Sequence, residues 1–77
     1  MSALLGYSSK VALRLIVGDV EIALAQVGRR DLILKSATAP LPPGDAELVI
    51  EVDGQPRRTA IVLPKGIQAD SRRVEYF

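Results

Sequence analysis

The chain contains no cysteine and no histidine among its 77 residues. Without cysteine, neither a disulfide nor a thiolate metal site can stabilise so short a chain. Without histidine, the sequence lacks the commonest zinc ligand and the usual general base near neutral pH. Catalysis by a Ser-His-Asp or Cys-His arrangement is excluded for the same reason. We therefore predict a protein that is not an enzyme and that uses no cofactor and no metal ion.

Aromatic side chains are also scarce, and tryptophan is absent: the aromatic residues are Tyr7, Tyr76 and Phe77. The core must then be built from Val, Leu, Ile and Ala. Such a core in 77 residues is modest, so a homodimer is a reasonable expectation. Hydrophobic residues make up 48% and charged residues 25%, which indicates one globular domain over residues 1–77 rather than a disordered chain.

Neither sign of charge dominates, because the chain has 10 Lys and Arg residues and 9 Asp and Glu residues. This balance does not favour a nucleic-acid binder driven by bulk charge. No apolar run approaches the ~20 residues of a membrane-spanning helix. Residues 1–6 lack the basic and long apolar regions of a secretory signal. We expect a cytoplasmic protein that does not use a membrane as its partner.

The clearest folding pattern is a hairpin over residues 11–27, in which Gly18 and Asp19 join two apolar stretches. Glycine tolerates the positive φ that a type II′ turn needs at its first central position. One register sorts the large apolar side chains onto a single face, with the pairs Val17–Val20, Leu15–Ile22 and Leu13–Leu24. A helix over residues 11–17 is the alternative, but the β-branched residues and the central Gly-Asp argue against it.

Turn residues divide the rest of the chain. Residues 32–35 form a third strand after a three-residue polar loop at residues 28–30, with Leu34 opposite Leu24. Residues 36–45 form a proline-rich crossover, because three prolines fix φ and lack N–H donors. We expect Leu41 to point inward there, and prefer a fixed crossover to a flexible linker because neither half has enough core alone. Residues 1–10 form an N-terminal arm, from which Leu4, Leu5 and Tyr7 can dock on the core.

A second hairpin follows, with Asp53-Gly54 as its turn signal between residues 46–52 and residues 59–63. We favour a four-residue loop over residues 53–56, because a two-residue loop would place Arg57 opposite Ile50. That choice sets three other pairs, Glu51–Arg58, Leu48–Ile61 and Ala46–Leu63. Residues 67–71 form a single turn, and residues 74–77 a short last strand. The whole predicts an all-β fold, a small antiparallel barrel or roll of five to six strands built from hairpins.

Three Arg-Arg pairs stand out as candidate anion-binding residues. Arginine makes forked contacts with phosphate or carboxylate, so pairs that converged at one rim would form an anion, nucleotide or RNA site. The alternative is ordinary surface ion pairs, because each pair has acidic neighbours and such pairs are worth little. On a strand, only one residue of each pair can serve a shared site. The candidates are Arg29, Arg30, Arg57, Arg58, Arg72 and Arg73.

The second face of the predicted sheet is not cleanly polar, because Ile16 and Val49 fall there beside small alanines. An antiparallel sheet with one wet face should alternate more sharply. Either the sheet curls until both faces are partly covered, or a second subunit covers one face. The terminal aromatic pair is a candidate core plug or dimer contact. The candidate interface residues are Ala12, Ile16, Ala23, Ala25, Tyr76 and Phe77.

The order of these strands over residues 11–63 resembles that of PilZ-type barrels, and residues 41–52 are similar to the middle of such domains. That family binds cyclic di-GMP through an Arg-x-x-x-Arg motif and an Asp/Asn-x-Ser-x-x-Gly motif. This chain has neither, because Arg14 is followed four residues on by Gly18, and Asp31 is not followed by the required serine. The resemblance therefore implies an architecture without the ligand.

The pattern Val-Asp-Gly, Arg-Arg and Leu-Pro-x-Gly-Ile over residues 52–67 is similar to small uncharacterised bacterial β proteins, which implies no activity. Residues 17–19 and 72–76 resemble RNA-binding dimers of the carbon-storage-regulator type. Together these observations favour a protein-interaction or regulatory module whose partner is a second copy or another protein. The alternative is binding of an anion, a nucleotide or RNA through the Arg pairs on a degenerate PilZ-like barrel.

Overall fold

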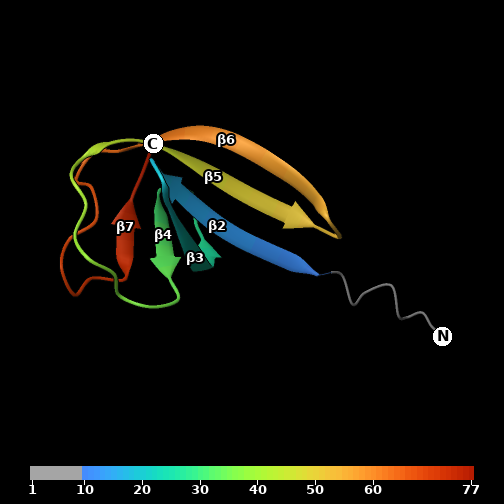
Figure 1. Cartoon of the computed structure of the whole chain (residues 1–77), viewed down its shortest axis with the longest axis horizontal. Helices are drawn as coiled ribbons and strands as arrows, with labels where there is room; N and C mark the ends of the chain where they lie inside the picture. Colours follow the sequence, from blue (N-terminus) through green and yellow to red (C-terminus); the bar gives the residue numbers. More distant parts are fainter. Residues whose placement is uncertain (1–9) are drawn as a thin grey trace.

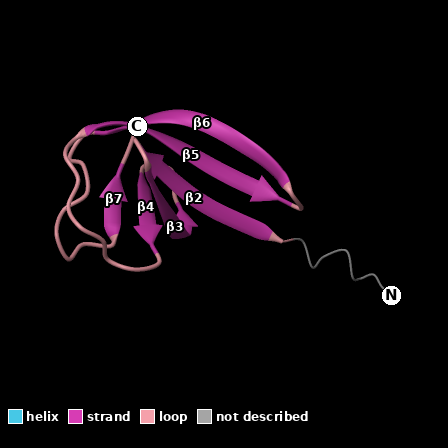
Figure 2. Ribbon diagram, viewed as in Figure 1, coloured by secondary structure: helices cyan, strands magenta, loops and turns pink. Residues whose placement is uncertain are grey.

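The computed structural model describes residues 10–77; the predicted docking of Leu4, Leu5 and Tyr7 lies outside the described residues. The described chain forms one antiparallel sheet with no helix (Figures 1 and 2). Its strands in sheet order are β6 (Gln55–Leu63), β5 (Gly44–Val52), β2 (Val11–Val17), β3 (Val20–Val27), β4 (Asp31–Leu34) and β7 (Arg73–Glu75). The predicted all-β class is confirmed.

The β2–β3 hairpin has the predicted turn. Gly18 has a φ of 60°, and Asp19 is not among the non-glycine residues with positive φ, as a type II′ turn requires. The observed pairs are those predicted nearest the turn, Val17–Val20 and Leu15–Ile22, together with Ile16–Glu21 and Arg14–Ala23. The ladder ends there, short of the predicted pair Leu13–Leu24, and β2 continues alongside β5 instead.

The pair Leu24–Leu34 forms as predicted, but the turn length and the register between β3 and β4 differ from the prediction. The turn between β3 and β4 is one residue longer than expected, since Val27 pairs with Leu32. A β-bulge at Ala25 then restores the register. A bulge bends and twists its strand, so this irregularity helps β4 fold over the inner face of the sheet.

The second hairpin corrects the sequence prediction. Asp53 and Gly54 have φ values of 52° and 81°, so they form the two-residue turn in which both central residues are left-handed. Ile50 therefore does face Arg57, and the predicted four-residue loop and its three pairs are wrong. The arrangement is tolerated because Arg57 is exposed. Pro56 is tolerated because β6 is an edge strand and the missing N–H would point away from β5.

Two long connections lie side by side at one end of the sheet (Figure 1). The crossover before β5 and the loop after β6 are joined by backbone hydrogen bonds in both directions between Leu41 and Ile67, at 2.8 and 2.9 Å. Leu41 packs on the core as predicted. Gly66 has a φ of 61°, and a β-carbon there would collide with the Leu41 carbonyl. The predicted turn at residues 67–71 is shorter, closing from the Ser71 N–H to the Gln68 carbonyl at 3.2 Å.

The core lies inside the curl of the sheet. It contains the buried side chains Leu15, Ile22, Leu24, Leu32, Leu34, Leu48, Ile61, Leu63, Ile67 and Val74, which come from all six strands and the loop after β6. Beyond β7, Phe77 exchanges two backbone hydrogen bonds with Val62 of β6, at 2.9 and 3.1 Å. The two edge strands thus meet at one residue pair. The sheet is otherwise open along β7, so the expectation of a barrel is corrected to a curled, open sheet.

The outer ends of β2, β5 and β6 extend beyond the other strands (Figure 1). We call residues 10–13 and 50–57 the outer ribbon, and the rest of the described chain the body. At the tip, the Asp53 N–H donates to the Lys10 carbonyl at 2.9 Å, and the Lys10 N–H donates to Asp53 Oδ1 at 3.1 Å. These bonds hold the start of β2 beside the β5–β6 turn.

Candidate binding surfaces

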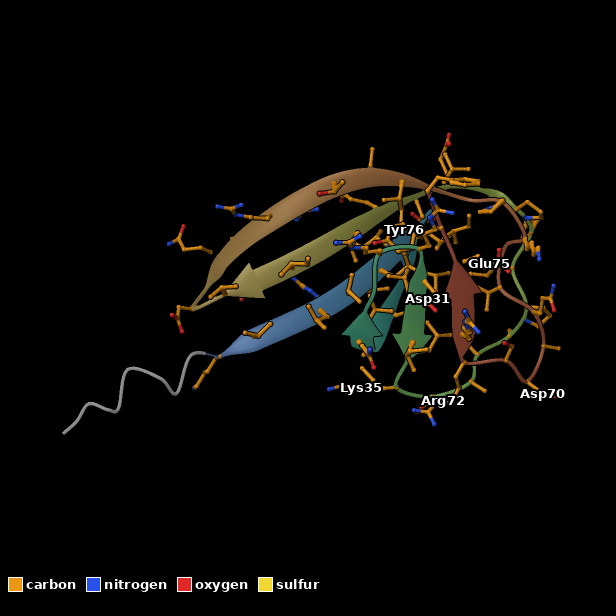
Figure 3. The ribbon with its side chains drawn as sticks, turned by 180° about the vertical axis from the view of Figure 1, so that it is seen from behind. Asp31, Lys35, Asp70, Arg72, Glu75 and Tyr76 are labelled. Carbon is orange, nitrogen blue, oxygen red and sulfur yellow. The ribbon has the colours of Figure 1, made fainter. Side chains whose placement is uncertain are left out.

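The three Arg-Arg pairs lie at three separate places. Arg29 and Arg30 are in the turn before β4, whereas Arg72 lies beside Leu34 at the other end of that strand. Figure 3 places Arg72 and the β4 residue Asp31 at opposite ends of β4. The third pair, at residues 57–58, is on β6 at the far edge of the sheet. The fold therefore does not bring the pairs together at one rim.

Three of the six candidate arginines donate side-chain hydrogen bonds. Arg58 donates to Glu47 at 2.7 Å, and Arg73 donates from Nε to Asp31 at 3.0 Å. Arg72 Nε donates to the Leu34 carbonyl at 2.9 Å, which fixes the chain just before β7. Contacts of this kind agree with surface ion pairs and structural hydrogen bonds, each worth little on an exposed surface.

The second face of the β2–β3 hairpin is organised around Arg14. Its two terminal nitrogens donate to Glu21 at 3.1 Å and to Glu51 at 3.0 Å, which ties β2 to both neighbouring strands. The Arg14 Nε is buried without a hydrogen-bond partner. Val49 lies next to Arg14 across the β2–β5 ladder and is fully buried, although it is not part of the main core. The arginine stem and its ion pairs thus cover an apolar residue on the outer face.

The predicted interface residues on this face form a surface of small side chains. Ala12, Ala23 and Ala25 are exposed, and Ile16 is partly buried. Arg14 and its acidic partners lie among them, so large apolar groups are not displayed here. The prediction that this face is an interface stays a prediction.

The two terminal aromatic residues have different environments. Tyr76 packs against the core, its hydroxyl donates to the Gly28 carbonyl at 2.5 Å, and its N–H donates to the Arg30 carbonyl at 2.9 Å. Phe77 is bonded through its main chain to Val62, but its side chain is 77% exposed. Tyr76 therefore anchors the end of β7 to the β3–β4 turn.

The inner face of the outer ribbon is an apolar surface that the body does not cover. Val11 pairs with Val52, and Leu13 pairs with Ile50, so alternation places all four on the face that carries the core further along. Val11 is 58% and Val52 41% exposed, whereas Leu15 is fully buried only four residues beyond Val11. The alternating pattern was visible in the sequence. The part of this apolar face that becomes covered depends on where β4 folds over it.

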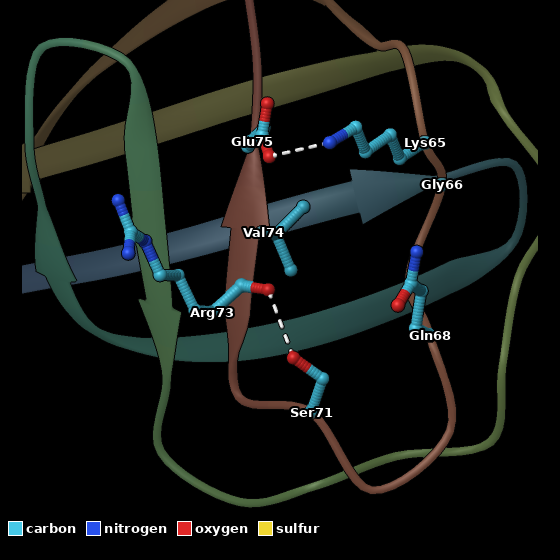
Figure 4. Close-up of a pocket in the computed structure, with 7 residues that line it drawn as sticks. All are labelled: Lys65, Gly66, Gln68, Ser71, Arg73, Val74 and Glu75. Atoms are coloured by element: carbon cyan, nitrogen blue, oxygen red, sulfur yellow. Dashed lines mark hydrogen bonds and ion pairs between the residues drawn. The ribbon is translucent and has the colours of Figure 1, made fainter.

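A cleft of about 280 Å³ separates β7 from the loop after β6 (Figure 4). Its lining includes Lys65 and Gly66 on one side, and Ser71, Arg73 and Glu75 on the other. Lys65 Nζ donates to Glu75 at 3.0 Å across the opening. Nothing in the sequence pointed to this cleft, because it exists only where the sheet fails to close.

A second groove of about 280 Å³ lies beside the first half of β3, which extends past the end of β4. It lies between β3 residues 20–23 and the chain at residues 35–38. The Lys35 N–H donates to the Ala23 carbonyl at 3.1 Å and closes one end.

Among residues 10–77, no three His, Cys, Asp or Glu side chains gather as metal ligands would. No helix that could span a bilayer is found in the same residues. Comparison with protein-family models, with curated proteins and with solved structures returns no match. The function must therefore be argued from the surfaces themselves.

Proposed function

We propose that this protein is a non-enzymatic protein-interaction module that pairs with a second copy of itself through the inner face of the outer ribbon. The observation that carries the proposal is the exposure of Val11 and Val52, at 58% and 41%, on a face continuous with the core. This apolar surface extends the core face past the strands that cover it. Burying it against another surface removes it from water and lowers the free energy.

A second copy fits this surface because the rim carries charges of both signs. Arg57 faces Ile50 on the same side of the sheet, while Lys10 and Asp53 lie at the tip. A two-fold axis through the apolar centre brings equivalent patches together, so that apolar side chains meet and basic groups can approach the acidic group of the other copy. The absence of histidine and cysteine supports a binding rather than a catalytic role.

The patch is small, with two exposed valines flanked by the partly buried Leu13 and Ile50. Obligate dimers bury far more surface than this patch offers, and weak interfaces bury less than about 1,200 Å² in total. We therefore expect reversible self-association with a dissociation constant on the order of 100 µM. A cytoplasmic location belongs to the same proposal, as does a distant relation to PilZ-type barrels in strand order.

Sedimentation equilibrium with matched valine variants tests the proposal. Val52→Ser and Val62→Ser remove the same apolar groups from valines that are 41% and 43% exposed. Only Val52 lies on the inner face of the outer ribbon. Wild-type protein and Val62→Ser should gain average mass between about 10 and 500 µM, while Val52→Ser should weaken association at least ~5-fold, or about 1 kcal/mol.

Two results would overturn the proposal. One is a wild-type protein that stays monomeric at about 500 µM, well above the expected dissociation constant. The other is equal weakening by Val52→Ser and Val62→Ser, which would place the contact elsewhere. Far-UV circular dichroism of each variant checks that the sheet is intact.

A further inference from the structure

We propose that the cleft beside β7 accepts an extended segment of another polypeptide, which pairs through its main chain with the open edge of β7. This site lies in the body, away from the outer ribbon, and does not depend on self-association. The inference rests on which backbone groups face the cleft, on what those groups can bond, and on the size of the opening.

The direction of the backbone groups follows from the β4–β7 ladder. The Leu34 N–H donates to the Arg72 carbonyl at 2.7 Å, and the Tyr76 N–H donates to the Arg30 carbonyl at 2.9 Å. In an antiparallel strand, the N–H and C=O of one residue point to one side, and those of the next residue point to the other. The backbone N–H and C=O groups of residues 72, 74 and 76 therefore point toward β4. Those of Arg73 and Glu75, which lie between them, point away from β4.

These outward groups face the cleft. Ser71 Oγ donates to the Arg73 carbonyl at 3.1 Å, and Figure 4 shows that carbonyl turned toward Ser71 at the lower end of the opening. The Arg73 N–H and the Glu75 N–H and C=O have no hydrogen-bond partner within residues 10–77. They form a short unpaired strand edge, of the kind to which a further strand can be added.

The mixture of donors and acceptors selects a peptide over an anion. A phosphate or carboxylate could accept from the two N–H groups, but it would also meet the carbonyls of Arg73 and Glu75 and the Glu75 carboxylate. An extended peptide offers a carbonyl to each N–H and an N–H to the Glu75 carbonyl. Its residue opposite Glu75 would exchange two bonds, as neighbouring strands do.

The size and walls of the cleft limit what enters. About 280 Å³ is at the low end of ligand pockets, which begin near 300 Å³, so a few residues of main chain fit better than a nucleotide. Val74 is buried between the two edge positions and points to the core side. The peptide residue beside Val74 should therefore be apolar, with polar residues on either side of it.

The ion pair between Lys65 and Glu75 spans the opening. Both side chains are more than half exposed, at 62% and 52%, so the pair is weak and can open at little cost. The ion pair involves side chains only, so it takes up none of the main-chain N–H and C=O groups of the β7 edge. Loss of the ion pair should therefore leave the edge intact and ease entry.

The probe is the blocked pentapeptide acetyl-Ser-Val-Ser-Val-Ser-amide, titrated into ¹⁵N-labelled protein and followed by amide chemical shifts. We expect saturable shifts centred on Arg73 and Glu75, with a dissociation constant on the order of 1 mM. The same peptide N-methylated at its serines lacks the N–H groups that would face the Glu75 carbonyl, and it should not bind. Inorganic phosphate is titrated in parallel.

Three variants locate the contact. Glu75→Pro removes an N–H that points away from β4, which an edge strand tolerates, and should weaken peptide binding at least ~5-fold, the loss of one hydrogen bond. Glu75→Gln removes the ion pair but keeps the N–H, so its binding should equal or exceed that of the wild type. Ala60→Pro is the matched control, because Ala60 occupies an outward position on the other edge strand, β6.

Several outcomes would overturn the inference. These are no amide shift up to about 10 mM peptide, ten times the expected dissociation constant, equal binding of the N-methylated peptide, or equal weakening by Glu75→Pro and Ala60→Pro. Shifts with phosphate alone would identify an anion site instead. The shifts of the Leu32 and Leu34 amides in each variant report whether β4 and β7 are still paired.

Discussion

The body and the outer ribbon are parts of one sheet with opposite surroundings. In the body, the inner face is closed by β4 and β7, and Leu15 and Leu34 are completely buried. In the outer ribbon, the same face of β2 and β5 carries Val11 and Val52 in the open. Alternation therefore decides which side chains share a face, but the curl of the sheet decides where that face becomes a core.

The largest contrast should come from truncating one apolar residue in each region. Leu34→Ala should lower the free energy of unfolding by about 2–5 kcal/mol, because the side chain is fully buried and leaves a cavity. Val52→Ala, 41% exposed, should change it by less than about 1 kcal/mol. Urea denaturation at low micromolar concentration, where self-association is negligible, measures both. Similar losses at the two positions would mean that the outer ribbon is packed.

Two glycines with left-handed backbone, one in each region, have different surroundings. Gly54, in the outer ribbon, has a φ of 81° and open space around it, so Gly54→Ala should cost about 1–2 kcal/mol of backbone strain. Gly66, in the body, has a φ of 61°, and its substitution also collides with the backbone of Leu41 and Pro42. Gly66→Ala should therefore cost a further ~1–3 kcal/mol. Thermal unfolding of both variants measures the two losses of stability. A smaller effect at Gly66 would show that the two loops are not held together.

The smallest effect is expected where the two regions are joined on the outer face. Glu51 of the outer ribbon accepts from Arg14 of the body, and both side chains are about one-third exposed, at 34% and 32%. Glu51→Gln should reduce stability by no more than about 1 kcal/mol at low salt. The difference from wild type should shrink in about 0.5 M NaCl, where screening is strong. Urea titrations at the two salt concentrations measure it, and a loss that does not depend on salt would indicate packing rather than charge.

Local rules predicted the fold well where short-range chemistry was decisive. Gly18 set the first turn, and the pairs nearest it followed from alternation alone. The second hairpin was predicted, but its register was wrong because the apolar pattern was given more weight than a two-residue Asp53-Gly54 turn. The turn prevailed, since Arg57 opposite Ile50 carries little penalty at an exposed edge.

The candidate surfaces were harder to predict. The Arg-Arg pairs were visible in the sequence, but their separation along β4 and across the sheet was not. The bulge at Ala25 left no sequence signal, yet it restores the β3–β4 register. The cleft beside β7 depends on two contacts between distant residues. Val62 and Phe77 form the one pair at which the edge strands meet, and the bridge between Leu41 and Ile67 holds the loop after β6.

Residue composition and local patterning account for the chemistry and the secondary structure: no histidine or cysteine, an aliphatic core, and alternating strands between tight turns. These follow from residue type and from neighbours along the chain. Long-range packing sets three further features: the sheet curls without closing, its apolar face runs past β4 and β7, and β7 keeps an open edge. Those features depend on contacts between residues far apart in the chain, which no local pattern encodes.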